Sequence, residues 1–596
     1  MSRKDIADYA LIGDCETAAL INRQGTLEWL CFPRFDSEAC CTALLGDEEN
    51  GCWKIDVAGA TGETSRRYRG DTLILETEIA CETGRVRLID FMPIRGEAPD
   101  VVRIVECLEG EAEVTSQLLL RFDYGRINPL VYEKGEKRAV AISGPDGVSL
   151  NFDVGIEFAD RRFTSQFTIT EGERRSLVLT WFPSHEKVPD RVDPIRALRD
   201  TEDFWADWLE EVEYHGEYRD TVVRSLITLK ALIHRPTGGI IAAPTSSLPE
   251  NPGGVRNWDY RYCWLRDATF TLLALTSMGM KQEAKAWIDW LRRATGGDPI
   301  HLQPFYTVTG DHRALEWTAD WLSGFNGAQP VRFGNGAEIQ LQLDVYGEVV
   351  DALYQAIEQG ISDSPETLAL IGMLADCLEK EWQKPDAGIW EIRSNPLHHT
   401  YSKVMCWAAF DRAAAAFRDH DEERCRRYRD LAREVAEEVL EKGFDKELNA
   451  FVYAFGSKKM DAAALRIPLV GFLPPDDPRV VGTVEAIERE LKHGPLVRRY
   501  AGDIEDGLEG DEGAFVAASF WLADVYCMQG RKDDARAIFE GLLDRANDLG
   551  LLSEELALDS TRQLGNFPQG LSHLSLVGTA YRLMNGHGED RPAQSE

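Results

Sequence analysis

Three features are missing from this 596-residue sequence: long hydrophobic runs, paired cysteines and an excess of positive charge. No stretch approaches the roughly 20 consecutive apolar residues that are needed to span a bilayer. The opening segment, Met1 to Gly13, mixes charged residues among apolar ones and lacks the continuous apolar core of a secretory signal. We therefore expect a soluble, cytoplasmic protein with no membrane partner.

Disulfide and zinc frameworks are also unsupported. The 12 cysteines are scattered along the chain, and no two have the Cys-x-x-Cys spacing. In a chain of this length such a pattern is typical of reduced, buried thiols. A structural zinc site needs closely spaced ligands, and the sequence has no compact ligand cluster that demands a metal. We therefore expect no structural metal site, and whether a metal or phosphate assists the protein is left open.

Positive charge is scarce relative to negative charge. The 66 Lys and Arg residues face 101 Asp and Glu residues, which gives a net charge of -35. Such a field repels nucleic acid and anionic lipid surfaces, so neither is expected as a partner. A small neutral substrate suits this field better than an anionic one. The acidic composition fits a salt-rich cytoplasm and an ordinary acidic bacterial enzyme equally well.

The first third of the chain is patterned as a β domain. Short segments of alternating apolar and polar residues, separated by Gly, Asp and Asn turns, run from Ile6 to about Pro189. Clear examples are 72–79, 86–91, 101–106, 114–120 and 176–181. This spacing predicts an antiparallel β-sandwich over residues 1–190.

The remainder of the chain is patterned as helices. Aromatic residues at helical spacing predict a linking helix within 191–214. Residues 215–586 contain about twelve further helical segments in adjacent pairs, and six such pairs could close into a double-layered helical toroid. Residues 587–596 are expected to form a flexible tail. Long loops separate the pairs, and loops of that length inside a compact domain are usually functional.

One of these loops contains a candidate general acid. The stretch Gly388-Ile389-Trp390-Glu391-Ile392-Arg393 sets a carboxylate between an indole and a guanidinium. Burial against the indole raises a carboxyl pKa, whereas a nearby Arg lowers it, so Glu391 holds its proton near neutrality only if desolvation dominates. The alternative is that Trp390 belongs to the core and Glu391 pairs with Arg393 on the surface.

A second loop ends in residues 257–267, which are dense in aromatic and charged side chains. Aromatic faces stack on sugar rings, and Arg266 beside Asp267 offers donors and acceptors for vicinal hydroxyls. The alternative is an ordinary helix start, with Asp267 near the positive end of the helix dipole.

A second carboxylate comes from the last long loop, at Ser553-Glu554-Glu555. This pair of acids could also be a helix start that Ser553 caps. Alternating polar residues at Gln340, Gln342 and Asp344 could line a segment that enters a pocket, or form a solvated face. The acidic cluster at 509–513 most simply places negative charge at the N-terminus of the following helix.

Taken together, these stretches resemble glycoside hydrolase family 15, the group of glucoamylases and family 15 trehalases. The resemblance is carried in chain order by Trp264-Leu265-Arg266-Asp267, Trp390-Glu391, Ser553-Glu554-Glu555, Asn566-Phe567-Pro568-Gln569 and Ser572-His573. Residues 6–14 and 25–36 resemble the trehalase-like N-terminal sandwich of bacterial and archaeal members. The similarity covers nearly the whole chain.

The resemblance implies an N-terminal β-sandwich followed by an (α/α)6 helical toroid. It also implies an inverting, exo-acting hydrolase that releases β-glucose from the non-reducing ends of small neutral α-glucosides, without a cofactor. Trehalose, isomaltose and maltooligosaccharides all remain open as substrates. By the family pattern Glu391 is the general acid and Glu554 the general base, with Glu555 as the base if the alignment slips by one residue.

The family pattern also implies the residues that hold the sugar. Arg266 and Asp267 would grip the terminal glucose, and Trp258, Asp259 and Trp390 would form the pocket walls. Two other functions remain as alternatives. One is a disaccharide phosphorylase, which needs a phosphate cradle in place of the second carboxylate, and the other is a non-catalytic sugar-binding protein. The oligomeric state is left open.

Overall fold

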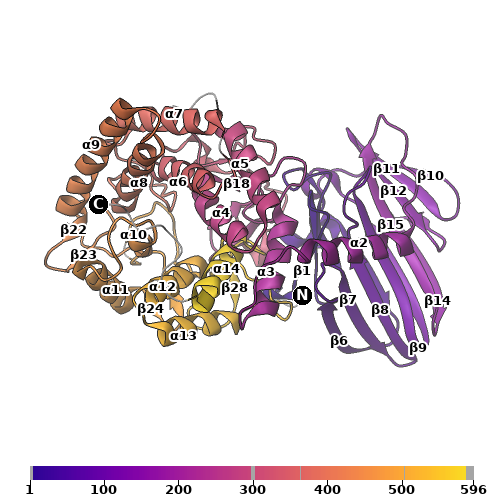
Figure 1. Cartoon of the computed structure of the whole chain (residues 1–596). Coiled ribbons are helices and arrows are strands. Elements are labelled where there is room, and N and C mark those ends of the chain that lie inside the picture. Colours follow the sequence, from indigo (N-terminus) through magenta and orange to yellow (C-terminus); the bar gives the residue numbers. More distant parts are fainter. Residues whose placement is uncertain (1–3, 297–301, 363, 503, 586–596) are drawn as a thin grey trace.

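The computed structural model describes residues 4–296, 302–362, 364–502 and 504–585. Figure 1 shows a sheet domain built from the N-terminal third of the chain beside a domain of helices built from the rest. The predicted fold class is confirmed: an antiparallel β-sandwich is followed by an (α/α)6 helical domain. The domain boundaries near residues 190 and 214 stay predictions, and the predicted tail at 587–596 lies outside the described residues.

The sandwich is antiparallel throughout. Its strands are β1 (Ala10–Gly13), β2 (Ala18–Ile21), β3 (Leu27–Cys31), β4 (Ala39–Cys41), β5 (Cys52–Val57), β6 (Ala60–Tyr68), β7 (Leu75–Cys81), β8 (Gly84–Phe91), β9 (Asp100–Leu119), β10 (Leu130–Glu133), β11 (Arg138–Ser143), β12 (Asp146–Phe152), β13 (Glu157–Ala159), β14 (Arg162–Thr170) and β15 (Arg174–Pro183). A short helix, α1 (Phe122–Gly125), follows β9.

One long strand, β9, belongs to both layers of the sandwich. Its first half pairs with β8 and β15, and its second half pairs with β5 and β14. Gly110, with a φ of 70°, lies where the partners change. The sequence predicted two strands here, because the exposed Glu109-Gly110-Glu111 segment has the composition of a turn. The glycine instead lets one continuous strand bend from one layer into the other.

The helical domain begins after α2 (Pro194–Leu209), the linking helix that the sequence predicted. Its side-chain cap is Asp193, which accepts hydrogen bonds from the backbone N–H groups of Ile195 and Arg196, and Pro194 occupies the first turn. The following helices are α3 (Arg219–Leu232), α4 (Ala268–Ser277), α5 (Lys281–Thr295), α6 (Asp344–Glu358), α7 (Pro365–Glu381), α8 (Thr400–Ala416), α9 (Glu422–Glu438), α10 (Arg466–Leu469), α11 (Pro478–Glu490), α12 (Val516–Met528), α13 (Lys532–Leu543) and α14 (Gly570–Asn585).

Six of these helices form an inner ring and six an outer layer. Around the inner ring, α4, α6, α8, α10, α12 and α14 each contact the next, and α14 contacts α4. Residues Val516–Cys527 of the inner helix α12 are all buried, whereas the outer helices α9 and α13 bury only one stripe each. This difference is expected when one helix is surrounded by protein and the other faces solvent.

The long loops lie at the N-terminal ends of the inner helices, and short strand pairs stiffen them. These pairs join β16 (Ser246–Pro249) to β17 (Asn257–Asp259), β18 (Cys263–Trp264) to β19 (Phe305–Tyr306), and β20 (Trp317–Thr318) to β21 (Arg332–Phe333). Three further strands, β26 (Ala514–Phe515), β27 (Glu555–Leu556) and β28 (Gln563–Leu564), form one small sheet, and β22 (Phe444–Asp445), β23 (Ala450–Phe451), β24 (Lys492–His493) and β25 (Leu496–Val497) form two hairpins.

The sandwich supports these loops from one side. The Trp29 indole Nε1 of β3 donates a hydrogen bond to the Pro244 carbonyl at 2.8 Å. Arg261, which is fully buried, donates through Nη1 to the Ser37 carbonyl at 2.8 Å and through Nη2 to the Tyr124 hydroxyl at 3.0 Å. The loop that carries residues 257–267 is therefore held in place by the N-terminal domain.

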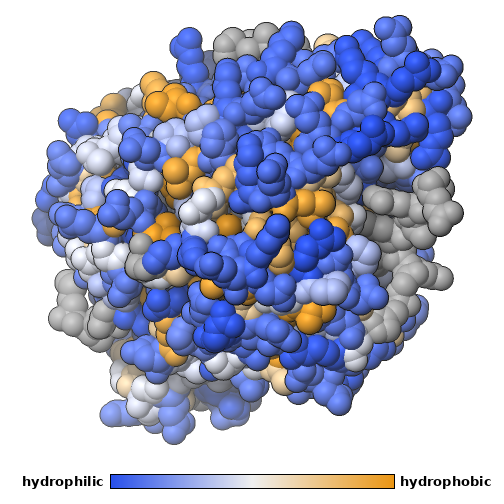
Figure 2. Space-filling view, turned by 90° about the vertical axis from the view of Figure 1, so that its left-hand side faces the viewer, coloured by the Kyte–Doolittle hydropathy of each residue, from blue (hydrophilic) through white to orange (hydrophobic). Residues whose placement is uncertain are grey.

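The surface of the helical domain and the state of the cysteines agree with what the amino-acid composition indicated. Figure 2 shows a face of the helical domain that is largely hydrophilic, with hydrophobic residues in separate small groups. All 12 cysteines are free and buried, as their scattered spacing predicted. Among the described residues no helix is both long enough and apolar enough to cross a membrane.

Candidate active site

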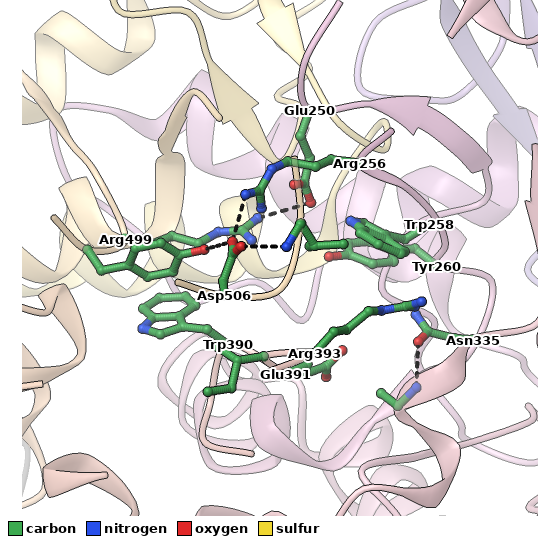
Figure 3. Close-up of a pocket in the computed structure, with 14 residues that line it drawn as sticks. Glu250, Arg256, Trp258, Tyr260, Asn335, Trp390, Glu391, Arg393, Arg499 and Asp506 are labelled. Carbon is green, nitrogen blue, oxygen red and sulfur yellow. Dashed lines mark hydrogen bonds and ion pairs between the residues drawn. The ribbon is translucent and has the colours of Figure 1, made fainter. Parts of the chain in front are cut away.

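A pocket opens among the loops that precede the inner helices (Figure 3). Its lining residues come from four of these loops: Glu250, Arg256, Trp258, Tyr260, Asn335, Ala337, Trp390, Glu391, Ile392, Arg393, Arg499, Tyr500, Asp506 and Leu508. In Figure 3, Trp390 and Glu391 lie across the pocket from Glu250 and Arg256. The lining therefore includes three of the residues that the sequence singled out, Trp258, Trp390 and Glu391.

Glu391 is held in a constrained turn at the pocket edge. Its φ of 56° is unusual for a residue with a side chain, and such backbone strain costs about 1–3 kcal/mol. Gln340 Nε2 donates to the carbonyls of Glu391 and Ile392, each at 3.2 Å. Asp386 accepts hydrogen bonds from the backbone N–H groups of Gly388 and Leu343 at 3.2 and 3.0 Å. These contacts fix the direction in which the Glu391 carboxylate points.

The carboxylate of Glu391 has two donors above it. The Trp264 indole Nε1 donates to Oε1 at 2.6 Å, and Arg266 Nη1 lies 3.4 Å from the same oxygen. Arg393, the other candidate partner, is instead paired with Glu316, with Nη2 2.6 Å from Oε2. Glu391 is thus free of Arg393, and 17% of its side chain remains exposed to the pocket.

Glu554 is buried on the other side of Tyr260. Its Oε1 accepts hydrogen bonds from the Tyr260 hydroxyl at 2.6 Å and from Arg499 Nη2 at 2.7 Å, and only 1% of the residue is exposed. Burial raises the pKa of the Glu554 carboxyl, whereas Arg499 and the Tyr260 hydroxyl oppose this rise because they stabilise the ionised form. The Tyr260 hydroxyl lies within electrostatic reach of both Glu554 and Glu391.

Glu555 points away from Tyr260 into an acidic cluster. Its Oε2 accepts a hydrogen bond from the Gly513 backbone N–H at 2.8 Å, and its Oε1 lies 2.9 Å from Arg499 Nη2. Burial raises the pKa of Glu555 well above its usual range, and Arg499 lowers it in part. Arg499 contacts both adjacent acids, and the Tyr260 hydroxyl hydrogen-bonds Glu554.

Arg266 and Asp267 lie below the pocket lining. Arg266 donates through Nη1 to the Ile389 carbonyl at 2.7 Å, and its Nε lies 3.4 Å from Asp267 Oδ1. Burial raises the pKa of Asp267, and the charges of Arg266 and Arg466 lower it. Arg266 thus links the Glu391 turn to the start of α4.

The three residues predicted to form the pocket walls, Trp258, Trp390 and Asp259, have different surroundings. The Trp258 ring is flanked by two guanidinium groups, with the Cζ atoms of Arg332 and Arg393 at 4.6 and 4.3 Å from its centre. Trp390 donates through Nε1 to Asp461 Oδ1 at 2.8 Å. Asp259 is fully buried and is absent from the pocket lining. It pairs with Arg261 at 2.6 Å, so its contact is with the support of the loop.

Three carboxylates behind Glu554 are close enough to share a ligand. One oxygen from each of Glu250, Glu512 and Glu555 lies within 4.8 Å of the others. Arg499 lies among them, at 3.4 Å from Glu250 and 3.8 Å from Glu512, and Arg256 lies 3.3 Å from Glu512. These guanidiniums supply the positive charge that the cluster needs, so the arrangement is that of an ion-pair network. Glu512, expected at a helix start, belongs to this network instead.

Sequence reasoning assigned no role to Tyr260, Trp264 or Arg499. Tyr260 and Trp264 stood in the aromatic stretch, but their partners Glu554 and Glu391 lie 294 and 127 residues away. Arg499 lies in a long loop, between an arginine and a tyrosine. These neighbours alone indicate a charged site only weakly. Only the folded chain brings these side chains to the two carboxylates.

An inner ring of helices whose loops carry Glu391 at an aromatic-lined pocket and Glu554 behind it is an arrangement typical of glycosidases. Residues 216–581 match the family described as glycosyl hydrolases family 15, and residues 2–161 match the trehalase-like N-terminal domain. The chain belongs to glycosyl hydrolases family 15.

Relatives extend this match over almost the whole chain. The trehalase of Thermoplasma volcanium is 35% identical, over 96% of this chain and 93% of its own length. The trehalase of Mycobacterium tuberculosis is 35% identical, over 98% of this chain and 90% of its own length. A bacterial glucoamylase complexed with acarbose has the same fold, with a TM-score of 0.75 and 14% identity over 98% of this chain and 94% of its own.

Proposed function

We propose that this chain hydrolyses α,α-trehalose by an inverting, exo-acting mechanism, with Glu391 as general acid and Glu554 as general base. The observation that carries the proposal is the unequal setting of the two carboxylates. Glu391 is part-exposed to the pocket beneath an indole donor, whereas Glu554 is buried and bound by Tyr260 and Arg499. Glu391 reaches the pocket, as a proton donor to the substrate must, and the Tyr260 hydroxyl and the Arg499 guanidinium stabilise the ionised form of Glu554 that a base needs.

The chemistry follows from these positions. The proton of Glu391 is transferred to the glycosidic oxygen while the bond from that oxygen to the anomeric carbon breaks. Glu554 removes a proton from a water molecule, whose oxygen forms the new bond on the opposite face of the same carbon. At the end of the reaction Glu391 is ionised and Glu554 is protonated. Inverting sites hold their carboxyl groups about 6.5 to 9.5 Å apart to admit this water.

The substrate grip is assigned by position. Arg266 lies 3.4 Å from the Glu391 carboxylate and 3.4 Å from Asp267, and the two residues offer donors and acceptors to the hydroxyls of the terminal glucose. Trp258 and Trp390 line the pocket and offer apolar ring surface to the sugar, with the Trp258 ring flanked by Arg332 and Arg393. Asp259 acts on the pocket through Arg261 and the loop that both residues share.

Trehalose is chosen over isomaltose and maltooligosaccharides because of the relatives. Proteins named as trehalases match both domains at 35% identity over more than nine-tenths of this chain. A small disaccharide also suits the cytoplasmic location that we propose, since starch does not reach that compartment. A phosphorylase would bind phosphate where the second carboxylate is, and Glu554 occupies that position.

The test is a product assay followed by NMR. Inverting hydrolysis of α,α-trehalose releases one β-glucose, from the attacked carbon, and one α-glucose, from the leaving group, in equal initial amounts. A retaining enzyme would release α-glucose alone, and a dependence on phosphate with glucose 1-phosphate as product would replace hydrolysis by phosphorolysis. Parallel assays with isomaltose, maltose, kojibiose and nigerose would move the assignment to another linkage if one of them were cleaved faster.

A further inference from the structure

One arginine in the lining of the catalytic pocket has hydrogen-bond donors to spare. Arg393 lies two residues beyond Glu391 in the same pocket, and 27% of its side chain is exposed. Glu316 accepts two of its hydrogen bonds, from Nη1 at 3.0 Å and from Nη2 at 2.6 Å. A guanidinium has five N–H donors, so the other three have no protein acceptor within the described part of the chain. These three donors are available to a ligand.

Asn335 adds a second unused donor group to the same side of the pocket (Figure 3). Its Oδ1 accepts a hydrogen bond from the Ala337 backbone N–H at 2.9 Å, whereas its Nδ2 has no hydrogen-bond partner among the described residues and is not sealed off by them. A Cβ added at the neighbouring Gly336 would lie 3.4 Å from Arg393 Nη2, so the amide and the guanidinium are close together. Because Asn335 is 3% exposed, an unpartnered donor there indicates a ligand with acceptor oxygens.

The Arg393 guanidinium is held in one orientation. Its Cζ lies 4.3 Å from the centre of the Trp258 ring, and its two Nη atoms pair with both oxygens of Glu316. Glu316 is fixed in turn by the Gly336 backbone N–H at 2.9 Å and by Arg332 Nε at 3.4 Å. A bidentate ion pair and an aromatic face together restrict the planar fork. The spare donors of Arg393 are therefore preorganised before any ligand binds.

The other arginines around the pocket are more enclosed. Arg256, across the pocket, is 5% exposed and already donates to two carboxylates and a backbone carbonyl. Arg266, which contacts the Glu391 carboxylate, has 11% of its side chain exposed, against 27% for Arg393. Arg266 thus lies on the enclosed side of Glu391 and Arg393 on the open side. A terminal glucose that Arg266 holds would place the rest of the substrate beside Arg393.

We propose that Arg393 and Asn335 bind the leaving glucose of trehalose, a proposal that rests on the proposed function. Glu391 protonates the glycosidic oxygen, so the leaving glucose lies beside the turn that also carries Arg393. In trehalose the carbon of the leaving glucose that bears the glycosidic oxygen also bears the ring oxygen. A ring oxygen only accepts hydrogen bonds, and the guanidinium and the amide nitrogen supply only donors at this place. The two residues therefore match the end of the leaving sugar that a 1,1 linkage presents.

α-Glucosyl fluoride separates this role from the rest of the site, because it has the same terminal glucose as trehalose but no leaving glucose. Arg393→Met removes the donors and keeps an unbranched side chain against Trp258. The ratio of kcat/KM for trehalose to kcat/KM for the fluoride should fall about ten- to hundredfold, the range for hydrogen bonds from a charged donor. Most of this fall should be a higher KM for trehalose, because the hydrogen bonds are made before the glycosidic bond breaks.

A second variant and a matched control accompany this measurement. Asn335→Ser keeps an oxygen that can accept from the Ala337 N–H but loses the amide donors, so the same ratio should fall about three- to tenfold. The control is Arg87→Met on β8 of the sandwich. Arg87 has 22% of its side chain exposed and pairs with Glu78 through Nε at 3.2 Å and Nη2 at 2.7 Å. Arg87→Met should leave the ratio unchanged, and circular dichroism checks that all three variants fold.

The outcomes separate this site from the proposed function. A lower ratio in Arg393→Met and Asn335→Ser, with an unchanged ratio in Arg87→Met, supports the binding of the leaving glucose. A ratio that stays unchanged in Arg393→Met and Asn335→Ser overturns it. If the native chain cleaves isomaltose or maltose but not trehalose, the proposed function fails, and the same ratio is measured with the disaccharide that is cleaved. A fall in that ratio then supports the leaving-sugar site, and an unchanged ratio overturns it together with the function.

Discussion

The Tyr260 hydroxyl donates a 2.6 Å hydrogen bond to Oε1 of Glu554, although the two residues are 294 positions apart. Tyr260 lines the pocket, whereas Glu554 lies behind it with 1% exposure. The tyrosine therefore connects the proposed base to the space in which the attacking water must lie, and it stabilises the ionised carboxylate in a buried environment.

Replacing Tyr260 by Phe should raise the pKa of Glu554, because the ionised form loses a donor while its burial is unchanged. Since the base must be ionised, the acid limb of the kcat/KM profile should move to higher pH, and kcat should fall about ten- to hundredfold. Tyr262→Phe is the control, because this neighbouring buried tyrosine makes no hydrogen bond to Glu554. An unshifted acid limb in Tyr260→Phe would remove Glu554 from the role of base.

Replacing Glu391 by Gln should separate substrates by their leaving groups. Trehalose needs a proton on its leaving oxygen, so its kcat should fall by about 10² to 10⁴. α-Glucosyl fluoride, whose fluoride leaves without protonation, should lose far less. Glu554→Gln should fail with both substrates, because water must be activated in either case. Equal losses with trehalose and the fluoride in Glu391→Gln would contradict its assignment as the acid.

Asp344 should destabilise the protein as the pH rises. Burial, together with the charges of Asp386 and Glu348, raises the pKa of this carboxyl to about 8. The native state therefore holds a proton that the unfolded chain releases near pH 4. The contribution of this proton to the free energy of unfolding is fully present below about pH 4 and is lost as the pH rises from about 4 to 8.

Asp344→Asn cannot ionise and should escape this loss. Its Tm should match that of the native chain at pH 4.5 and exceed it by about 1–3 °C at pH 8.5, as measured by differential scanning calorimetry. Asp220→Asn, at a side chain that is 99% exposed, should give no such pH-dependent difference. A constant difference between Asp344→Asn and the native chain at both pH values would show that Asp344 is ionised throughout.

The sequence predicted the fold well because its signals are local. Alternation in 1–190 and helical spacing in 215–586 reflect which side of each element meets the core, and this is decided within a few residues. The exception was β9, where the Glu109-Gly110-Glu111 segment mimicked a turn. Its continuity depends on pairing with strands from elsewhere in the chain.

The site was less predictable because its contacts are distant in sequence. Glu391 and Glu554 could be proposed from their neighbours and from family resemblance, and Trp258 and Trp390 line the pocket. Asp259, like Glu391, is a carboxylate that directly follows a tryptophan in the sequence. Asp259 nevertheless pairs with Arg261 and lies outside the pocket lining. A carboxylate in an aromatic loop can face either the pocket or the N-terminal domain that holds the loop in place. Which of the two it faces depends on the strand pairing of that loop.

Gln340 illustrates the same point and carries the last prediction. The sequence left its side chain either lining a pocket or on a solvated face, whereas its amide donates to the carbonyls of Glu391 and Ile392 and so supports a turn whose φ of 56° is strained. Gln340→Leu should let this turn relax and misplace the Glu391 carboxyl. We expect kcat to fall roughly tenfold with little change in KM, since the sugar is gripped elsewhere.

Gln529 offers a matched control for this variant. It is also half-buried and donates through Nε2 to a backbone carbonyl, that of Pro475, at 3.0 Å. Gln529→Leu removes one hydrogen bond at the C-terminal end of α12, at the far end of the ring, whereas Gln340→Leu removes three, so Gln529→Leu should lower Tm by less and leave kcat unchanged. If Gln340 were merely structural, Gln340→Leu would lower Tm and leave kcat unchanged, as in Gln529→Leu. A kcat loss confined to Gln340→Leu would identify Gln340 as the residue that positions the acid.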